Sequence, residues 1–199
     1  MKWSVSINYF AEAMKNKLFF KKGKNLTQEE LEIVNFWRKK EFNSQNLVTP
    51  RPGNDDWNKI YTLLNSPSNN ILAFGRIHDV NLEFMGESYS VFGIATLIAT
   101  VKGKGYGSEV LNGQLSYAEK RDKTVIGFCN KKLTEYYRKR GLLILEDGAE
   151  RFLYKDDDDK LHENPWGGGD VIYINGKDNL MDLVIKNPEE KVISYRQHW

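Results

Sequence analysis

The hydrophobic residues between positions 27 and 42, TQEELEIVNFWRKKEF, recur at the spacing of one helix face. Thr27 and Glu30 open this segment at the spacing of a capping box, in which each side chain bonds the backbone N–H of the other. The pattern therefore predicts a helix. After the loop VTPRPGN, Asp55-Asp56-Trp57 predicts the start of a second helix that runs to about Asn65, where SPSNN ends it.

The pattern then changes to that of strands. ILAFGRIHDV at 71–80 and SYSVFGIATLIAT at 88–100 are rich in β-branched and aromatic residues, and a turn at Met85-Gly86-Glu87 separates them. These segments predict an antiparallel pair. The second strand leads into a glycine loop, a helix is predicted from Gly105 to Arg121, and TVIGFC is the next strand, so that strand, loop, helix and strand follow one another.

Shorter segments follow. KLTEYYRKR predicts a short helix, and acidic or glycine-rich breaks separate four pieces of strand length and composition, LLILED, RFLYK, DVIYI and LMDLVI. Between them, YKDDDDK resembles a common epitope tag without its first Asp. Because the composition does not change after it, we interpret Asp156 to Asp159 as a natural acidic surface loop, with an engineered insert as the alternative.

Composition narrows the class of protein. The chain has 199 residues, 40% of them hydrophobic, which is enough apolar material for one globular domain over residues 1–199. Its 29 basic and 27 acidic side chains leave a formal net charge of +2, so we expect neither nucleic acid nor a membrane as partner. No apolar run approaches the ~20 residues that span a bilayer, and the N-terminus lacks the pattern of a secretory signal.

The cysteine and the histidines of the chain predict neither a disulfide nor a metal site. The one cysteine, Cys129, excludes an internal disulfide and an all-cysteine zinc site, and it fits a reducing cytoplasm, where we expect the protein. We interpret Cys129 as a buried small hydrophobe at a strand end rather than a nucleophile. His78, His162 and His198 lie far apart without ligand spacing, so we expect no metal.

The stretch VKGKGYGSEVL, residues 101–111, places three glycines before a predicted helix. Outward-pointing N–H groups at a helix start suit an anion, usually a phosphate. A Walker loop ends in Gly-Lys-Ser/Thr, whereas no lysine separates Gly107 from Ser108 here. A dinucleotide fingerprint needs GxGxxG and an acidic residue about 20 positions on, whereas TVIGFC carries no acid at its end. Both known loops therefore fit poorly.

The loop Lys102-Gly103-Lys104-Gly105-Tyr106-Gly107 resembles the acyl-CoA loop of the GNAT N-acetyltransferase superfamily, with Lys102 where Arg or Gln is usual. CNKKLTEYYRKRGLLI resembles the second motif of that superfamily, whose Asn, Tyr and Gly are matched in register by Asn130, Tyr137 and Gly141. The two motifs together span about residues 88 to 145. By this resemblance the chain is identified as a member of the superfamily.

The resemblance implies an acetyl-CoA-dependent N-acetyltransferase with a mixed, mostly antiparallel sheet, helices on both of its faces and a bulged strand before the CoA loop. The loop and its lysines would bind the CoA pyrophosphate, the strand end and Asn130 would bind pantetheine and the thioester carbonyl, and Tyr137 would protonate the leaving thiolate. The implied cofactor-binding residues are Leu97, Ile98, Ala99, Lys102, Gly103, Lys104, Gly105, Tyr106, Gly107, Ser108 and Asn130. The alternatives are a packing role for Tyr137 and plain solvated charges for the lysines.

A finer resemblance joins NDDWNKI, the segment ILAFGRIHDVNLEFMGESYSV and the ending SYRQHW to the aminoglycoside 2'-N-acetyltransferases, over roughly residues 50 to 199. It implies that the carboxylate of Trp199 faces the acceptor amine, as a substrate ligand or a base, and the alternative is that Trp199 packs on the sheet. Asp55 and Asp56 would supply negative charge for a cationic acceptor, unless they only cap a helix.

This chain also departs from that family. Gly93, Ile94 and Ala95 occupy the stretch where the family places a glutamate that acts as base through water, and Ser194 and Gln197 replace aspartates. Each lost carboxylate removes a contact to a polycationic acceptor, so polyamines, peptide amines or another less cationic amine are alternatives to aminoglycosides. A noncatalytic acyl-CoA-binding or regulatory module is the competing function, and the sequence leaves a homodimer open.

Overall fold

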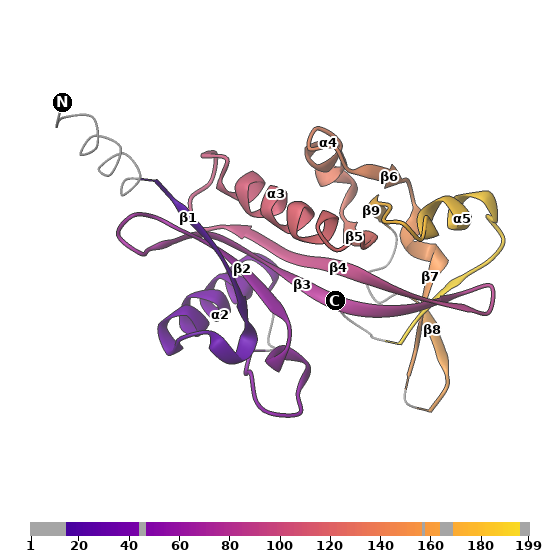
Figure 1. The fold of residues 1–199 in the computed structure, drawn as a ribbon, viewed down its shortest axis with the longest axis horizontal. Helices are drawn as coiled ribbons and strands as arrows, with labels where there is room; N and C mark the ends of the chain where they lie inside the picture. The colour runs from indigo at the N-terminus through magenta and orange to yellow at the C-terminus, as the bar shows by residue number, and fades with distance from the viewer. Residues whose placement is uncertain (1–14, 44–46, 157, 164–168, 196–199) are drawn as a thin grey trace. The chain divides into compact units, whose positions relative to one another are not determined.

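The computed structural model describes residues 15–43, 47–156, 158–163 and 169–195. These described residues form two compact units, the first within residues 1–76 and 96–113 and the second within residues 77–95 and 114–199. Three elements contribute residues to both units: β3 (Ile71–Phe84), β4 (Glu87–Ala99) and α3 (Tyr106–Glu119) (Figure 1). Single turns of 3₁₀ helix lie at Gly23–Asn25, Asp55–Trp57, Lys131–Leu133 and Gly148–Arg151.

The first unit contains β1 (Lys17–Lys22), α2 (Gln28–Phe42) and β2 (Ile60–Asn65). β1 and β2 are antiparallel, and β2 also pairs with β3. The predicted capping box starts α2, since Glu30 N–H donates to Thr27 Oγ1 at 3.2 Å and Thr27 N–H donates to Glu30 Oε2 at 2.9 Å. The helix ends at Asn43, whose φ of 49° is left-handed. The prediction for residues 27–42 is confirmed.

Alternate residues of β2 face two different helices. Tyr61 and Leu63 are buried in a cluster with Val34 of α2, whereas Leu64 is buried in a cluster with Val110 of α3. Successive side chains of a strand point to opposite faces of the sheet. Within the first unit, the sheet therefore carries a helix on each face, as the resemblance implied.

The helix predicted from Asp55 to about Asn65 is wrong. The structure has one 3₁₀ turn at Asp55–Trp57, which Asn54 caps by accepting from Trp57 N–H at 3.2 Å, and then the strand β2. Because Tyr61 to Leu64 are buried on both faces of the sheet, the short apolar run has no helical period to distinguish it. The strand β1, which pairs with it, was not predicted either.

The second unit contains the strand order β6-β9-β5-β4-β3-β10-β7-β8. Its further strands are β5 (Val125–Cys129), β6 (Leu143–Leu145), β7 (Phe152–Lys155), β8 (Leu161–Glu163), β9 (Asp170–Ile174) and β10 (Val192–Ser194). β4 is parallel to β5 and β10 is parallel to β7, whereas β9 is antiparallel to both β5 and β6, and β8 is antiparallel to β7. A mixed, mostly antiparallel sheet is thereby confirmed.

The hairpin between β3 and β4 turns at Met85 and Gly86, whose φ angles of 53° and 79° are both positive. Two positive φ angles are the signature of the tight turn that fits the twist of a hairpin. The predicted turn and the predicted strand pair are confirmed. The predicted helices at 105–121 and within KLTEYYRKR are also present, as α3 and as α4 (Thr134–Arg138).

LMDLVI was predicted as a strand, and this is wrong, because it forms the helix α5 (Leu180–Lys186). Leu180, Met181 and Val184 are fully buried whereas Leu183 and Ile185 are 37% and 42% exposed, which is a helical period. Arg151 ends the helix by donating hydrogen bonds to the carbonyl groups of Val184, Asn187 and Glu190.

Among the described residues, no helix is both long and apolar enough to cross a membrane.

Candidate active site

The glycine loop between β4 and α3 adopts a backbone that only glycine takes without strain. Gly103 and Gly105 have φ angles of 74° and 81°, and a Cβ at either position would meet no described atom within 4 Å. Conformation, rather than lack of space, therefore requires glycine here. Ser108 and Glu109 N–H donate to Gly105 O at 2.8 and 3.2 Å, so Gly105 directly precedes α3. The N–H groups of Tyr106 and Gly107, which come before them, have no acceptor within the helix.

The two lysines of this loop are on the surface. Lys102 Nζ lies 3.1 Å from Glu41 Oε1 near the end of α2, and the Lys102 side chain is 63% exposed. Such a surface pair contributes about 0–1 kcal/mol, so it competes weakly with an incoming phosphate. Lys104 is exposed as well. Both side chains are therefore accessible for the predicted role in binding pyrophosphate.

Within β4, the strand before the loop, Thr96 has a left-handed backbone with a φ of 55°. A β-branched residue in the left-handed region is rare and costs on the order of 1–3 kcal/mol. A residue of this kind inside a strand has the conformation found in bulges. Thr96 directly precedes Leu97, Ile98 and Ala99, where the resemblance implies a bulge. These three side chains pack in the first unit, so their predicted role in binding pantetheine rests on their backbone groups.

In the second unit, Asn130 and Tyr137 lie on consecutive short elements after β5. Asn130 is exposed, and its Oδ1 accepts from Lys132 N–H at 3.0 Å, which starts the turn that leads into α4. Tyr137 is half-buried, with its ring edge-on to Tyr136 at 5.1 Å. Burial raises the pKa of Tyr137 above its ordinary value, and neighbouring Cys129 raises it further. The phenol therefore keeps its proton at neutral pH.

Cys129 is buried, 7% exposed, as interpreted from the sequence. Burial raises the pKa of its thiol, and a hydrogen bond with Thr134 opposes that shift only in part. The thiolate, which is the reactive form, is therefore disfavoured. Cys129 does not have the surroundings of a nucleophile.

A buried carboxylate that the sequence did not reveal holds this segment in place. Asp170, 3% exposed at the start of β9, accepts hydrogen bonds from Thr134 Oγ1 and, at 3.0 Å, from Asp147 N–H. Burial alone would raise the pKa of Asp170, but these hydrogen bonds outweigh it and hold the pKa below its ordinary value. The charged Asp170 thus fixes the start of α4, on which Tyr137 lies.

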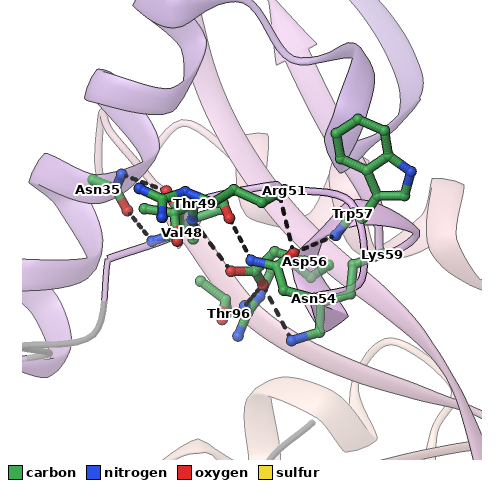
Figure 2. A network of polar contacts seen from close by, with 10 residues as sticks. Asn35, Val48, Thr49, Arg51, Asn54, Asp56, Trp57, Lys59 and Thr96 are labelled. Atoms are coloured by element: carbon green, nitrogen blue, oxygen red, sulfur yellow. Dashed lines mark hydrogen bonds and ion pairs between the residues drawn. The ribbon is translucent and has the colours of Figure 1, made fainter.

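The carboxylate of Asp56 already has partners in the structure. Its Oδ1 lies 3.1 Å from Lys59 Nζ, and its Oδ2 accepts from Thr49 N–H at 3.3 Å (Figure 2). The same Oδ1 lies 3.8 Å from Arg76 Nη1. Asp55 is exposed, and Asn54 rather than either aspartate caps the turn. Two cations therefore compensate the negative charge that the sequence assigned to a cationic substrate.

Arg76, which forms an ion pair with Asp56, was not among the residues predicted from the sequence. It is 8% exposed, and its Nε donates to Thr96 Oγ1 at 3.0 Å. The signal was an arginine within the apolar segment ILAFGRIHDV, because a cation in a buried strand needs polar partners. Those partners come from separate elements and could not be named in advance.

Most of the remaining predicted residues lie near the C-terminus. Trp199, Gln197 and His198 lie outside the described residues, and Ser194 is buried in β10. Within the described ranges, no three His, Cys, Asp or Glu side chains gather as a metal site would require. The expectation of no metal stays a prediction.

Comparison with known proteins gives a fold. No protein-family model matches the sequence, and no curated protein matches it. Among solved structures, Escherichia coli ElaA superposes with a TM-score of 0.54 at 16% identity, over 80% of this chain and 99% of ElaA. An acyl-CoA N-acyltransferase from Pseudomonas aeruginosa gives 0.51 at 19% identity, over 78% and 98% of the two chains. An N-acetyltransferase from Staphylococcus aureus gives 0.50 at 13% identity, over 81% and 97%.

The fold is that of the GNAT N-acetyltransferases. In this GNAT fold, the elements β4, glycine loop, α3 and β5 correspond to the segment whose motif was recognised in the sequence. At these low identities the comparison bears on the fold alone. The aminoglycoside 2'-N-acetyltransferase resemblance, the single-domain organisation and the assigned roles of individual residues stay predictions.

Proposed function

We propose that this protein is an N-acetyltransferase that moves an acetyl group from acetyl-CoA to a primary amine of a small molecule. The observation that carries the proposal is the glycine loop at the start of α3, with Gly103 and Gly105 in left-handed conformations. Such a helix start binds phosphate through its N–H groups. The acyl-CoA N-acyltransferase fold supports a thioester donor.

The residues of the loop fit the pyrophosphate of CoA. Its positive-φ glycines leave the backbone uncovered, and the exposed Lys102 and Lys104 add two positive charges beside it. Acetyl-CoA supplies an activated acetyl thioester whose carbonyl carbon accepts the amine nitrogen. As the new C–N bond forms, the C–S bond breaks and the sulfur takes the electron pair.

Tyr137 is the proposed general acid for this step. Its pKa is raised by burial, so the phenol holds a proton when the C–S bond breaks and donates it to the sulfur. The Asp170 and Thr134 hydrogen bond keeps α4 in position for that transfer. The base that takes the amine proton is proposed to be the carboxylate of Trp199 or a water relay to backbone carbonyl groups.

The acceptor class follows from the balance of charges. The resemblance to aminoglycoside 2'-N-acetyltransferases proposes an aminoglycoside bound through Asp55, Asp56 and Trp199, and polyamines or peptide amines are the second class. Lys59 and Arg76 weigh against a polycationic acceptor, because they already compensate Asp56. The acceptor panel therefore also includes amino acids and peptides, whose carboxylates reduce their net positive charge.

A noncatalytic acyl-CoA-binding module is the second candidate function. The observation that favours it is the stretch Gly93, Ile94 and Ala95 in β4, which has no side chain that could act as a base. A module of this kind binds acetyl-CoA and releases no thiol with any amine. Thiol release and acetyl-CoA binding must therefore be measured separately.

The test is thiol release from acetyl-CoA with aminoglycosides, polyamines, amino acids and peptides, each against the no-acceptor background, beside calorimetric titration with acetyl-CoA. The proposal expects binding and turnover with at least one amine class. Binding without turnover across the panel favours the noncatalytic module. Absence of acetyl-CoA binding contradicts both functions.

A further inference from the structure

Five polar residues of the first unit form one connected group, which we call the Arg76 cluster: Asp56, Lys59, Tyr61, Arg76 and Thr96. They come from the 3₁₀ turn at Asp55–Trp57 and the residues after it, from β2, from β3 and from β4. Figure 2 shows Asp56, Lys59 and Thr96 of this cluster. The side chains of Asp56, Lys59 and Arg76 are 16%, 11% and 10% exposed. The charges of the cluster are thus largely, but not wholly, removed from water.

Positive charge exceeds negative charge within the cluster. Lys59 and Arg76 both form ion pairs with the carboxylate of Asp56. The guanidinium of Arg38 is a third cation that interacts with Arg76 and Asp56, whereas Asp55 adds a weaker negative charge near Lys59. Burial lowers the pKa of the Lys59 ammonium, and Arg76 lowers it further, against the opposing effect of Asp56. Cations held together away from water are costly unless anions compensate them. One more anion would therefore be favourable here.

The guanidinium of Arg76 has one close hydrogen bond and one longer ion pair. Nε donates to Thr96 Oγ1 at 3.0 Å, whereas Nη1 is 3.8 Å from Asp56 Oδ1, which is an ion pair beyond hydrogen-bonding distance. The Nη side keeps donors for a closer, bidentate anion. Beside it lies the buried hydroxyl of Tyr61, which interacts with Arg76; this interaction lowers the pKa of Tyr61 and opposes part of the effect of burial. Burial raises the pKa of Tyr61 to about 12, so its hydroxyl remains a donor.

The residue that positions Arg76 is also the strained one. The left-handed φ of 55° at Thr96 is strained, and in this conformation the Thr96 hydroxyl accepts the hydrogen bond from Arg76 Nε. It directly precedes Leu97, Ile98 and Ala99, the segment proposed to bind the pantetheine arm. An anion on Arg76 would therefore lie close, along the chain, to the donor's reactive end.

We propose that Arg76 and Lys59 bind the carboxylate of the acceptor, so that the acceptor is an amino acid, a short peptide or a related amine that also carries a carboxylate. This inference rests on the proposed function and names its substrate class. The bidentate fork of Arg76 matches a carboxylate in geometry, with Lys59 as a second charge and Tyr61 as a third donor. A carboxylate on the acyl chain of the donor has the same chemistry and is the other source to be tested.

The first experiment compares kcat/KM for matched amines with and without the carboxylate, glycine against glycinamide and β-alanine against β-alaninamide. The wild-type protein is expected to prefer the carboxylates by about tenfold or more. Arg76→Gln removes that preference and leaves turnover of the amides, whereas Arg121→Gln, an exposed arginine of the second unit, retains the preference. Equal rates for acid and amide, or a preference that survives in Arg76→Gln, overturn the inference.

Asp56→Asn should change the affinity for carboxylate amines in the direction opposite to Arg76→Gln. It removes the competing carboxylate and retains an oxygen for Thr49 N–H. The affinity for carboxylate amines is expected to rise in Asp56→Asn, where simple damage to the cluster would lower it. Circular dichroism and thermal unfolding of every variant identify those that fold. A fall in affinity in a folded Asp56→Asn protein contradicts the proposed competition.

Two further arms separate the inference from the proposed function. Calorimetry with N-acetylglycine measures carboxylate binding without turnover, and affinity is expected to fall about tenfold in Arg76→Gln. No binding of N-acetylglycine overturns the inference even where neutral amines are acetylated. Succinyl-CoA with glycinamide tests the donor as the source, and turnover that exceeds that with acetyl-CoA and is lost in Arg76→Gln overturns the assignment to the acceptor.

Discussion

Thr134 Oγ1 donates a hydrogen bond to the buried carboxylate of Asp170 and so joins the start of α4 to the start of β9. This contact fixes the orientation of the short helix that carries Tyr137. Thr134→Val keeps the shape of the side chain and leaves a buried charge with one donor fewer. We expect a loss of about 1–3 kcal/mol in the free energy of unfolding, measured by urea denaturation. Thr134→Ser, which retains the hydroxyl, should unfold close to the wild type.

Asp170 also predicts how stability depends on pH. Its pKa is lower in the folded protein than in the unfolded chain, so its contribution is complete above the unfolded value of about 3.9. The contribution is lost as the pH falls through the lower folded value. Urea unfolding at several pH values should therefore show a stability gap between wild type and Asp170→Asn at neutral pH that narrows below about pH 4. A gap that stays constant in acid would contradict the charged state assigned to Asp170.

Gly105 tests the phosphate-binding loop. Gly105→Ala places a Cβ on a residue with a φ of 81° and is expected to cost about 1 kcal/mol of stability. Residue 105 directly precedes α3, so strain at this position shifts the N–H groups of the first turn of the helix. The dissociation constant for acetyl-CoA should therefore rise about tenfold or more. Gly86→Ala is the matched control, with a φ of 79° and open space at the hairpin tip. If Gly86→Ala weakens acetyl-CoA binding equally, general destabilisation explains the effect.

Tyr137 tests the chemistry. Tyr137→Phe keeps the ring and removes the proton, so kcat should fall by a factor on the order of 10²–10⁴ while the calorimetric affinity for acetyl-CoA is unchanged. Tyr136→Phe, the neighbouring phenol, is the control and should retain turnover. The raised pKa of Tyr137 further predicts that wild-type kcat does not fall as the pH rises to about 10, the ordinary value for a phenol. Unchanged turnover in Tyr137→Phe would assign the ring to packing.

Local signals in the sequence predicted the parts of the fold that depend on neighbouring residues. Thr27 and Glu30 form the capping box whose spacing indicated it, and Met85 and Gly86 form the expected turn. The glycine loop was predictable for the same reason, because φ requirements and helix starts are properties of a few consecutive residues.

Other parts depend on contacts that no short pattern contains. IYTLL and LMDLVI are short apolar runs of similar length, and the sequence assigned both wrongly, the first as a helix and the second as a strand. IYTLL is a strand because it pairs with β1 and β3. LMDLVI is a helix whose end is bound by Arg151. The Arg76 cluster was unpredictable in the same sense, since its members lie as far apart as Asp56 and Thr96.

The buried thiol of Cys129 has a practical consequence for the laboratory. It is the chain's one cysteine, and both its burial and its raised pKa protect it from disulfide reagents and alkylating agents. A chromogenic disulfide reagent can therefore report released CoA continuously without titrating or inactivating the native protein. A cysteine introduced at a chosen surface position would likewise be the sole point of labelling for a fluorophore or spin probe.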